Sequence, residues 1–458
     1  MSEHVALPKD LLSWIEKEVG GAVVRVDRVP GGGVRQGWIV DLSTDDTVHE
    51  LFLRYSPQPP GPGFHPLSTE AEVIRALGEA GAPVPTVHAV HPEKEAVLLE
   101  RIPGETWFSR ITDPDEQIRV ARDFIRALAA IHRLDPATLD IPSFGPVRSA
   151  REHALERIDH VRARARRPDG TIDPLVRIST DWLERNVPDY DGPVVLVQGD
   201  TGPGNFLYQD GRVTAILDWE LSHWGDPMDD IAWLSLRTVQ DTFTHLPDRL
   251  AEYAELSGHE IDEERVWYYR VFAETTMATL RSPEPPRPPG SVPETVTRDY
   301  GNALIYTQLH RRLWLEALNV VMNLGLQPPE PPARVDYPEW DHLYAEALGM
   351  LRTVTPRISD PLASRWVKGV ARILRHLREI DAAGDELADL EREDIAALLG
   401  RPCSSLTEGR AALEEANRVG RVSDEDYVRY WWNRVMRDNY LKRTALGVLS
   451  TRTWPPLV

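Results

Sequence analysis

The stretch from Val194 to Asp230, VVLVQGDTGPGNFLYQDGRVTAILDWELSHWGDPMDD, narrows the possible folds of this chain more than any other. A short apolar run leads into a polar turn, and two strand-like runs joined by an Asp-Gly turn follow it. The second of these runs ends on Asp218. A strand that ends on a carboxylate, beside a loop that carries another carboxylate and an amide, builds a site for a divalent cation and a phosphate group.

Three residues in this stretch have a chemical reason to be there. Asp200 lies at the tip of the loop, where a carboxylate can orient a hydroxyl group for attack or accept its proton. Asn205 offers a neutral oxygen and Asp218 a charged one, and Mg²⁺ prefers hard oxygen ligands of these kinds. An ordinary hairpin with surface carboxylates is the alternative, because Asp, Gly and Asn are also common turn residues.

The composite pattern resembles the catalytic segment of the aminoglycoside phosphotransferase and choline kinase family, whose members are related to protein kinases. That family's segment has the form HGDxxxxN, then a short hairpin, an IDWE-like strand end and GDPxxDLA. This chain has QGDTGPGN, ILDWE and GDPMDDIA. The resemblance implies that Asp200 is the catalytic aspartate and that Asn205 and Asp218 hold Mg²⁺.

The same resemblance assigns supporting roles to further residues. Asp226 and Asp230 are expected to brace the catalytic loop and the helix that follows it. Gln198 stands where the family usually has histidine, so the support of the loop is expected to differ here. His132, near the end of a predicted helix over 115–134, is expected to be structural rather than catalytic.

The first hundred or so residues predict an antiparallel sheet with one helix. Strand-like runs occur at 22–29, 37–42 and 48–54. The segment PGGGVRQG lies between the first two runs, and backbone amides of Gly31, Gly32 and Gly33 could approach nucleotide phosphates there. Most glycine-rich turns only connect two strands, which is the alternative. The segment is not a P-loop, because neither GxxxxGKS nor GxxxxGKT occurs.

Nucleotide contacts at other positions are implied by the resemblance. Arg54 ends the third run, where the family's fold needs a cation for the α- and β-phosphates, paired with a carboxylate on the next helix. Glu70 is the expected partner of this cation, and Glu72 is the alternative. Backbone groups near Glu100 and Ile102 are expected to meet the adenine, at the hinge between two lobes.

These features predict an α+β fold of the two-lobed protein-kinase type, followed by a small all-α domain. The expected N-lobe, with an antiparallel sheet and a helix, covers 1–102. A mostly helical C-lobe with the catalytic and metal site covers 103–330, and a C-terminal helical domain covers 331–458. The proline-rich stretch LQPPEPPARVDYPEW is expected to be the linker before this last domain.

The C-terminal domain is predicted to contain five helices, at 343–351, 361–382, 386–399, 406–418 and 424–446. Apolar residues in the second helix recur every three or four positions, so one of its faces is expected to be buried: Leu362, Trp366, Val370, Ile373, Leu377 and Ile380. Another face carries a basic stripe of Arg365, Lys368, Arg372 and Arg375. This stripe is either a solvated charged face or a dock for a phosphorylated ligand, an acidic partner or the acidic kinase domain. The same helices could join copies of the chain into a homo-oligomer.

Charge and composition bound the remaining possibilities. The chain has 52 basic and 72 acidic side chains, a formal net charge of -20. This balance disfavours nucleic acid as a partner and could attract a cationic substrate, or it could serve solubility alone. A single cysteine, Cys403, excludes a disulfide framework. The N-terminal segment lacks a signal-peptide pattern and no apolar run is long enough to span a membrane, so a cytoplasmic protein without a membrane partner is expected.

The sequence therefore predicts a phosphotransferase that uses ATP or GTP with Mg²⁺ and moves the γ-phosphoryl group to a hydroxyl of a small molecule. The expected acceptor is an aminoglycoside or a related hydroxylated metabolite. A hydroxyacyl thioester from catabolism is an alternative acceptor, and a non-catalytic regulatory pseudokinase is an alternative function. Glu220, Glu274 and Asp299 are candidates for the rim of an acceptor pocket.

Overall fold

The computed structural model describes residues 7–29, 35–44, 47–58, 64–280, 290–291, 299–333 and 335–458. The chain forms two compact units. Unit 1 contains Met1–Arg157, Val187–Tyr269 and Pro455–Val458, and unit 2 contains Ile158–Asn186 and Arg270–Trp454. The units divide the chain at other points than the expected domain boundaries after 102 and 330, which stay predictions. Gly31, Gly32 and Gly33 lie outside the described residues.

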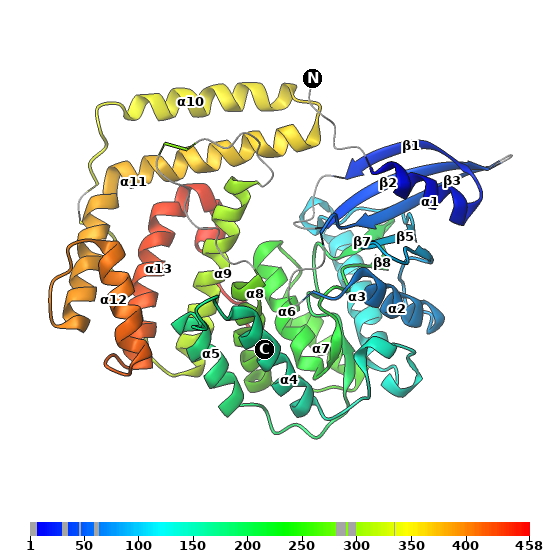
Figure 1. Ribbon diagram of the computed structural model, residues 1–458, viewed down its shortest axis with the longest axis horizontal. Coiled ribbons are helices and arrows are strands. Elements are labelled where there is room, and N and C mark those ends of the chain that lie inside the picture. Colours follow the sequence, from blue (N-terminus) through cyan, green and yellow to red (C-terminus); the bar gives the residue numbers. More distant parts are fainter. Residues whose placement is uncertain are drawn as a thin grey trace. The chain divides into compact units, whose positions relative to one another are not determined.

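Unit 1 begins with a five-stranded antiparallel sheet in the order β1-β2-β3-β5-β4 (Figure 1). Its strands are β1 (Ala22–Val29), β2 (Gln36–Thr44), β3 (Thr47–Tyr55), β4 (Val87–Val90) and β5 (Ala96–Glu100). Two smaller antiparallel pairs follow, β6 (Val195–Val197) with β9 (His223–Gly225) and β7 (Phe206–Gln209) with β8 (Arg212–Ile216). The first three strands lie where the sequence predicts them, within about two residues at each end.

The rest of the described chain is mostly helical, and with the sheet it forms the α+β class that the sequence predicts. Unit 1 contains α1 (Lys9–Val19), α2 (Leu67–Glu79), α3 (Pro114–His132), α6 (Pro227–Gln240) and α7 (Leu246–Ser257). Unit 2 contains α5 (Pro174–Arg185), α9 (Tyr300–Val321), α10 (Asp341–Val354), α11 (Pro361–Leu399), α12 (Leu406–Arg418) and α13 (Asp424–Leu446). Residues of α4 (Ala150–Ala165) and α8 (Glu263–Leu280) are shared between the units. Short 3-10 helices are η1 (Phe108–Arg110), η2 (Pro136–Thr138), η3 (Pro142–Phe144), η4 (Thr355–Arg357) and η5 (Gly447–Ser450). None of the described helices is both long and apolar enough to cross a lipid bilayer.

Side-chain alternation in β3 decides which face of the sheet carries Arg54. Leu51 and Leu53 are buried with Leu11 and Ile15 of α1, in a cluster that covers one face of the sheet. Because neighbouring residues of a strand point to opposite faces, Arg54 points away from α1. β3 lies between β2 and β5, so the cation stands on an interior strand of the sheet, which both neighbours hold in place.

The β7–β8 hairpin brings together two polar residues of the predicted site. Phe206 pairs with Ile216, and the backbone N–H of Leu217 donates to the carbonyl of Asn205 at 2.8 Å. This hydrogen bond continues the ladder one step beyond the hairpin. Asp218 is the next residue, and it is therefore placed beside Asn205.

Unit 2 is built around α11, which packs against α13, α12, α9 and α10. The prediction of two helices at 361–382 and 386–399 is wrong, because α11 runs without a break through 39 residues. Gly384 lies in its interior, where glycine costs about 1 kcal/mol relative to alanine. Ala383 and Leu387 are buried against Leu441 of α13. Burial of a leucine side chain contributes about 1.5 to 3 kcal/mol, so packing outweighs the local cost of the glycine.

The predicted burial of the apolar face of α11 is also wrong. Trp366 is 38% exposed, Val370 46%, Leu377 43% and Ile380 39%. The buried positions of this helix are instead mostly further along it, and those on the first half include Gly369. A spacing of three and four residues identifies an apolar face but does not say whether another element covers it. An oligomer formed through these helices stays a prediction.

Candidate active site

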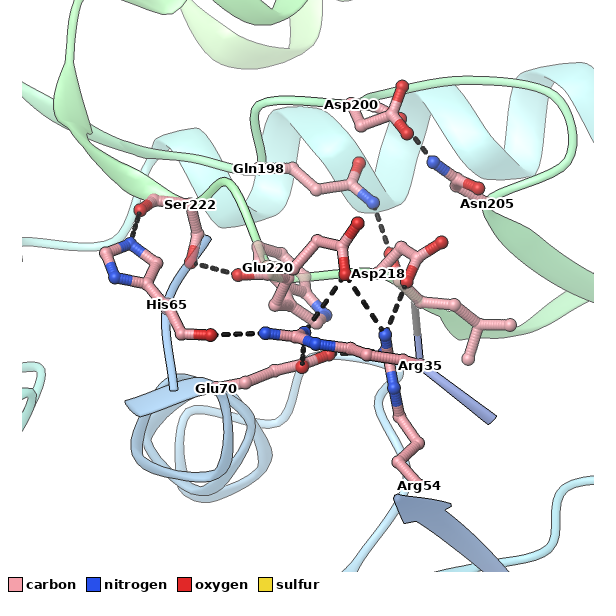
Figure 2. Close-up of polar contacts among 12 residues, drawn as sticks. Arg35, Arg54, His65, Glu70, Gln198, Asp200, Asn205, Asp218, Glu220 and Ser222 are labelled. Carbon is pink, nitrogen blue, oxygen red and sulfur yellow. Dashed lines mark hydrogen bonds and ion pairs between the residues drawn. The ribbon is translucent and has the colours of Figure 1, made fainter. Parts of the chain in front are cut away.

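The loop after β6 carries the predicted catalytic residue, Asp200 (Figure 2). Asn205 donates from its side-chain amide to the backbone carbonyl of Asp200 at 2.7 Å, which closes the loop. Gly199 has a φ of +81°, and a β-carbon there would lie 2.5 Å from the carbonyl oxygen of Leu221. Glycine alone fits this conformation and close approach. The loop therefore holds Asp200 in a defined place, with its carboxylate partly open to solvent.

The carboxylate of Asp230 ties this loop to the first turn of α6. Its oxygens accept the backbone N–H groups of Gln198 at 2.8 Å and Gly199 at 3.0 Å. One of them also accepts the hydroxyl group of Thr201. Asp230 is fully buried, where each polar group needs a partner because water cannot supply one. This is the position expected of a residue that braces the catalytic loop.

His132, the histidine expected to be structural, lies behind Asp230. Its Nε2 is 3.0 Å from Asp230 Oδ2, and its Nδ1 is 2.6 Å from the hydroxyl oxygen of Tyr253. The imidazole ring is completely buried. His132 therefore extends the network that supports Asp230 and is out of reach of a substrate.

Gln198 and Asp226, the other two residues with expected supporting roles, contact the end of a strand and the start of a helix. The side chain of Gln198 donates to the backbone carbonyl of Leu217, so it links the catalytic loop to the end of β8. Asp226 caps α6, because it accepts the backbone N–H of Met228 at 2.9 Å and pairs with Arg265 at 2.9 Å. Burial raises the pKa of Asp226 to about 6, although Arg265 opposes the rise. Asp226 thus supports the start of the helix rather than the loop itself.

Asn205 and Asp218 direct oxygen atoms to one small region (Figure 2). The amide nitrogen of Asn205 is used by Asp200, which leaves its carbonyl oxygen as the end that can bind a cation. Asp218 has a φ of +61°, a left-handed backbone that few residues other than glycine adopt and that concentrates at functional sites.

The chemistry of these two donors fits Mg²⁺. No group of three or more His, Cys, Asp or Glu side chains within the described ranges is placed to hold a metal ion. Mg²⁺ is nevertheless commonly bound through one or two carboxylates, with water and substrate phosphates completing its shell. One carboxylate and one amide oxygen, as Asp218 and Asn205 provide, are therefore a sufficient protein contribution.

Carboxylates hold Arg54 on several sides. Its guanidinium donates to Glu70 Oε1 at 2.5 Å and to Asp218 Oδ1 at 2.9 Å, and Glu220 Oε2 lies 3.5 Å away. Glu70, on α2, is buried, whereas Glu72 bonds to a backbone N–H outside this cluster. Burial acts to lower the pKa of Arg54, but attraction to Glu70 and then to the other two carboxylates outweighs it and raises the pKa. The side chain is therefore always charged.

Arg35 is a second cation of this cluster, and it was not expected from the sequence. Its Nη1 lies 2.6 Å from Glu70 Oε2 and 3.0 Å from Glu220 Oε2. Glu220, one of the candidates for an acceptor rim, thus belongs to the cluster. Burial, followed by the negative charge of Asp218, raises the pKa of Glu220 to about 8, while Arg54 and Arg35 act to lower it. The sequence feature that could have identified Arg35 was the presence of a cation inside the glycine-rich segment PGGGVRQG.

Arg237 of α6 pairs with the predicted catalytic residue and was not expected either. Its Nη2 donates to Asp200 Oδ2 at 3.1 Å. Its Nε lies 3.0 Å from Asp200 Oδ1 as an ion pair, without the alignment of a hydrogen bond. Gly202 has a φ of +136°, and a β-carbon there would lie 2.7 Å from Cβ of Arg237, so the glycine makes room for the arginine. The sequence feature that could have identified Arg237 was its spacing, because it follows Asp230 by two turns on one helix face.

The expected hinge residues lie at the end of β5 and just beyond it. The backbone N–H of Glu100 donates to the carbonyl of Thr86 at 2.8 Å, and the Glu100 carboxylate accepts the Thr86 hydroxyl at 2.8 Å. This N–H is therefore already used and cannot serve an adenine ring. Ile102 lies where the chain leaves the sheet, and a contact of either residue's backbone with adenine stays a prediction.

The other two candidates for an acceptor rim lie in unit 2. Glu274 is buried and bonded to His310 at 2.9 Å. Asp299 caps α9 and pairs with Arg365 at 2.9 Å. Because neighbours within unit 2 already use both carboxylates, their evident roles are structural.

Comparison with known proteins finds sequence similarity over the part of the chain that contains the candidate active site. The model of the phosphotransferase enzyme family matches residues 29–267, more than half of the chain. The chain is 30% identical over 226 residues to acyl-CoA dehydrogenase family member 11 of Rattus norvegicus, which covers 46% of this chain and 28% of that protein. It is 28% identical over 248 residues to an aminoglycoside 3'-phosphotransferase of Streptomyces fradiae, which covers 49% of this chain and 85% of that protein.

A solved structure of a choline kinase from Streptococcus pneumoniae is 17% identical to this chain, with a TM-score of 0.44 over 59% of this chain and 88% of that one. The chain spans less than a third of the length of the acyl-CoA dehydrogenase relatives that it matches.

Proposed function

Because this chain belongs to the phosphotransferase enzyme family, whose model covers residues 29–267, we propose that it transfers the γ-phosphoryl group of ATP to a hydroxyl group of a small molecule. One observation carries the proposal. Asn205 bonds to the backbone of Asp200, Leu217 beside Asp218 bonds to the backbone of Asn205, and Arg54 donates to Asp218 (Figure 2). Phosphoryl transfer needs mainly positioning and charge neutralisation from a protein, and this region offers both. GTP is the alternative phosphoryl donor.

Asp200 orients the acceptor hydroxyl and takes up its proton as the hydroxyl oxygen bonds to the γ-phosphorus, while the bond from this phosphorus to the β–γ bridging oxygen breaks and ADP leaves. Arg237 pairs with this carboxylate through one hydrogen bond and a second close contact, so the acceptor meets an aspartate whose direction is restrained. Asp230 holds the backbone of the same loop. The loop is thus positioned before substrates bind, which lowers the entropy lost on reaching the reactive geometry.

The nucleotide phosphates would lie between Arg54 and the two oxygen ligands. Asn205 and Asp218 would hold Mg²⁺, which supplies positive charge to the phosphate oxygens when it is bound. Arg54 would exchange its contact with Asp218 for contacts with phosphate oxygens. Glu70 stays in place during this exchange, because Arg35 holds its other oxygen.

A direct assay tests the proposal. The purified protein is incubated with ATP or GTP, Mg²⁺ and a panel of hydroxylated metabolites and antibiotics, and the phosphorylated product is identified by mass spectrometry. We expect transfer that depends on the acceptor and stops when EDTA removes the divalent ion. Failure of every acceptor, together with no measurable nucleotide binding, would favour a non-catalytic protein on this scaffold.

A hydroxyacyl thioester is a second candidate acceptor, and two observations favour it. Relatives at up to 30% identity carry the name of an acyl-CoA dehydrogenase family member. In addition, Arg237 neutralises the charge of Asp200 by pairing with it, so this carboxylate attracts a polycationic aminoglycoside less. The two acceptors differ in the sign of their charge, so both belong in the panel at several salt concentrations. A KM that rises with ionic strength identifies the acceptor that the site attracts electrostatically.

Replacing Glu70 with glutamine is expected to raise the KM for nucleotide by about tenfold and to change kcat less. The amide keeps the size of the side chain but removes the charge that holds Arg35 at 2.6 Å and Arg54 at 2.5 Å. Glu72→Gln is the matched control, because Glu72 lies on the same helix and bonds outside the cluster. Steady-state kinetics of both variants measures the effect, and equal KM values in the two would separate Glu70 from nucleotide binding.

Replacing Arg237 with glutamine is expected to lower kcat by about 10- to 100-fold with little change in the KM for nucleotide. Glutamine removes the positive charge that pairs with Asp200, so the carboxylate is held less firmly in its direction. Arg237→Lys keeps the charge but not the planar fork and should recover only part of the rate. Steady-state kinetics separates kcat from KM, and full activity of both variants would show that the arginine has no positioning role.

A further inference from the structure

A second concave region lies in unit 2, between α10 and α11, which run alongside each other (Figure 1). The cavity has a volume of about 400 Å³. Its lining includes the cations Arg352, Lys368, Arg372 and Arg375 and the apolar side chains Leu348 and Leu351. Three of these cations belong to the basic stripe that the sequence shows on α11. The catalytic site described above uses none of these residues.

Helix periodicity explains why the cations converge. Lys368, Arg372 and Arg375 are separated by four and three residues, so they share one face of α11. Arg352 lies in the last turn of α10, the helix that packs along this face. The pair of helices therefore presents four positive charges to one cavity.

Among the described residues, no carboxylate forms an ion pair with these cations. Arg372 donates to the amide oxygen of Asn302 at 2.9 Å. Arg378, further along the same helix, pairs instead with Asp341 at 2.6 Å. In a chain with a net charge of -20, four cations around one cavity that have no carboxylate partner among the described residues indicate a site for an anion.

We propose that this cavity binds a small molecule that carries at least two phosphate groups. Arginine engages phosphate through parallel N–H groups and lysine adds a point charge, while Leu348 and Leu351 contact an apolar part of the same ligand. A volume of about 400 Å³ suits a molecule of nucleotide size. Nucleic acid and an anionic membrane surface are disfavoured, because the acidic remainder of the protein repels an extended polyanion.

Titration calorimetry of the full chain with pyrophosphate, in EDTA and at fixed ionic strength, tests the proposal. We expect the double variant Arg372→Ala/Arg375→Ala to bind pyrophosphate at least about tenfold more weakly than the unmodified chain, because charge-assisted contacts are lost. Arg392→Ala is the matched control, since Arg392 lies on the same helix, pairs with Asp389 and is not part of the cavity lining. This control should bind as tightly as the unmodified chain.

Two further variants keep the test decisive. Arg54→Ala changes the catalytic site and should leave this binding intact, which distinguishes the cavity from the nucleotide site. Circular dichroism establishes whether the double variant is folded. If it is not, Arg352→Ala/Lys368→Ala takes its place, because both of these side chains are exposed, and the same loss of affinity is expected.

Several results would overturn the proposal. The first is that pyrophosphate does not bind the unmodified chain, and the second is that all variants bind it equally. The third is that sulfate binds as tightly as pyrophosphate, which would indicate a charged surface without a shaped site. The fourth is that duplex DNA or anionic vesicles bind more tightly than pyrophosphate and that the double variant loses this binding. The natural ligand would then be an extended polyanion and not a small molecule.

Discussion

Asp200→Ala is expected to lower kcat for phosphoryl transfer by about 10²- to 10⁴-fold and to leave nucleotide affinity unchanged. The carboxylate that orients the acceptor hydroxyl is removed, and alanine offers no oxygen in its place. The groups proposed for the nucleotide, Arg54, Asn205 and Asp218, are not changed, and the contact from Asn205 to residue 200 involves only a backbone carbonyl. A coupled assay of ADP release measures turnover, and calorimetry with a non-hydrolysable ATP analogue measures binding.

A double-variant cycle makes this test specific. If Arg237 acts only by holding Asp200, then Arg237→Gln lowers the rate of the unmodified protein but causes no further loss in the Asp200→Ala background. Losses that multiply would place Arg237 against a substrate instead. Turnover that survives in Asp200→Ala would remove this carboxylate from its proposed role.

The largest loss of stability is expected for Asp230→Ala, about 3 to 5 kcal/mol in the free energy of unfolding. The change deprives the loop N–H groups, the Thr201 hydroxyl and the His132 ring of their shared partner. Asp230 is fully buried, so water cannot replace the lost carboxylate. Urea unfolding followed by circular dichroism measures the effect.

Thr201→Ala provides the graded control for this prediction. It removes one hydrogen bond of the same network and leaves the other donors of Asp230 in place, so a loss of about 1 kcal/mol is expected. The two variants should therefore differ several-fold in their effect. A loss in Asp230→Ala no greater than that in Thr201→Ala would contradict the idea that one carboxylate holds the network together.

Local sequence patterns predicted the bounds of elements whose start and end depend on neighbouring residues. The strand at 22–29 and the helix at 424–446 were predicted with the bounds that the structure has. Ser423 indicates the start of this helix, because its side chain accepts the backbone N–H of Asp426 as an N-cap. The residues of the predicted catalytic loop were chosen because a carboxylate, glycines and an amide occur in a fixed order within one continuous stretch, and their catalytic role stays a prediction.

Residues that meet only in the folded chain were not found from the sequence. Arg35 reaches Glu70 across 35 positions, and Arg237 reaches Asp200 across 37, and no local pattern joins either pair. The predicted burial of the apolar face of α11 was wrong for the same reason, because elements distant in the sequence decide whether such a face is covered. The expected contact of the glycine-rich turn with nucleotide phosphates stays a prediction, because that turn lies outside the described residues.

The left-handed backbone at Asp218, with its φ of +61°, restricts which residues natural variation can tolerate at this position. Glutamate would bring the same charge, but a longer side chain costs roughly 1 to 2 kcal/mol in this conformation. Glycine adopts it freely and asparagine more readily than most residues, yet of these two only asparagine keeps an oxygen to offer. Of the possible substitutions at this position, asparagine is therefore expected to disturb the backbone least while it keeps an oxygen where the proposed Mg²⁺ ligand lies.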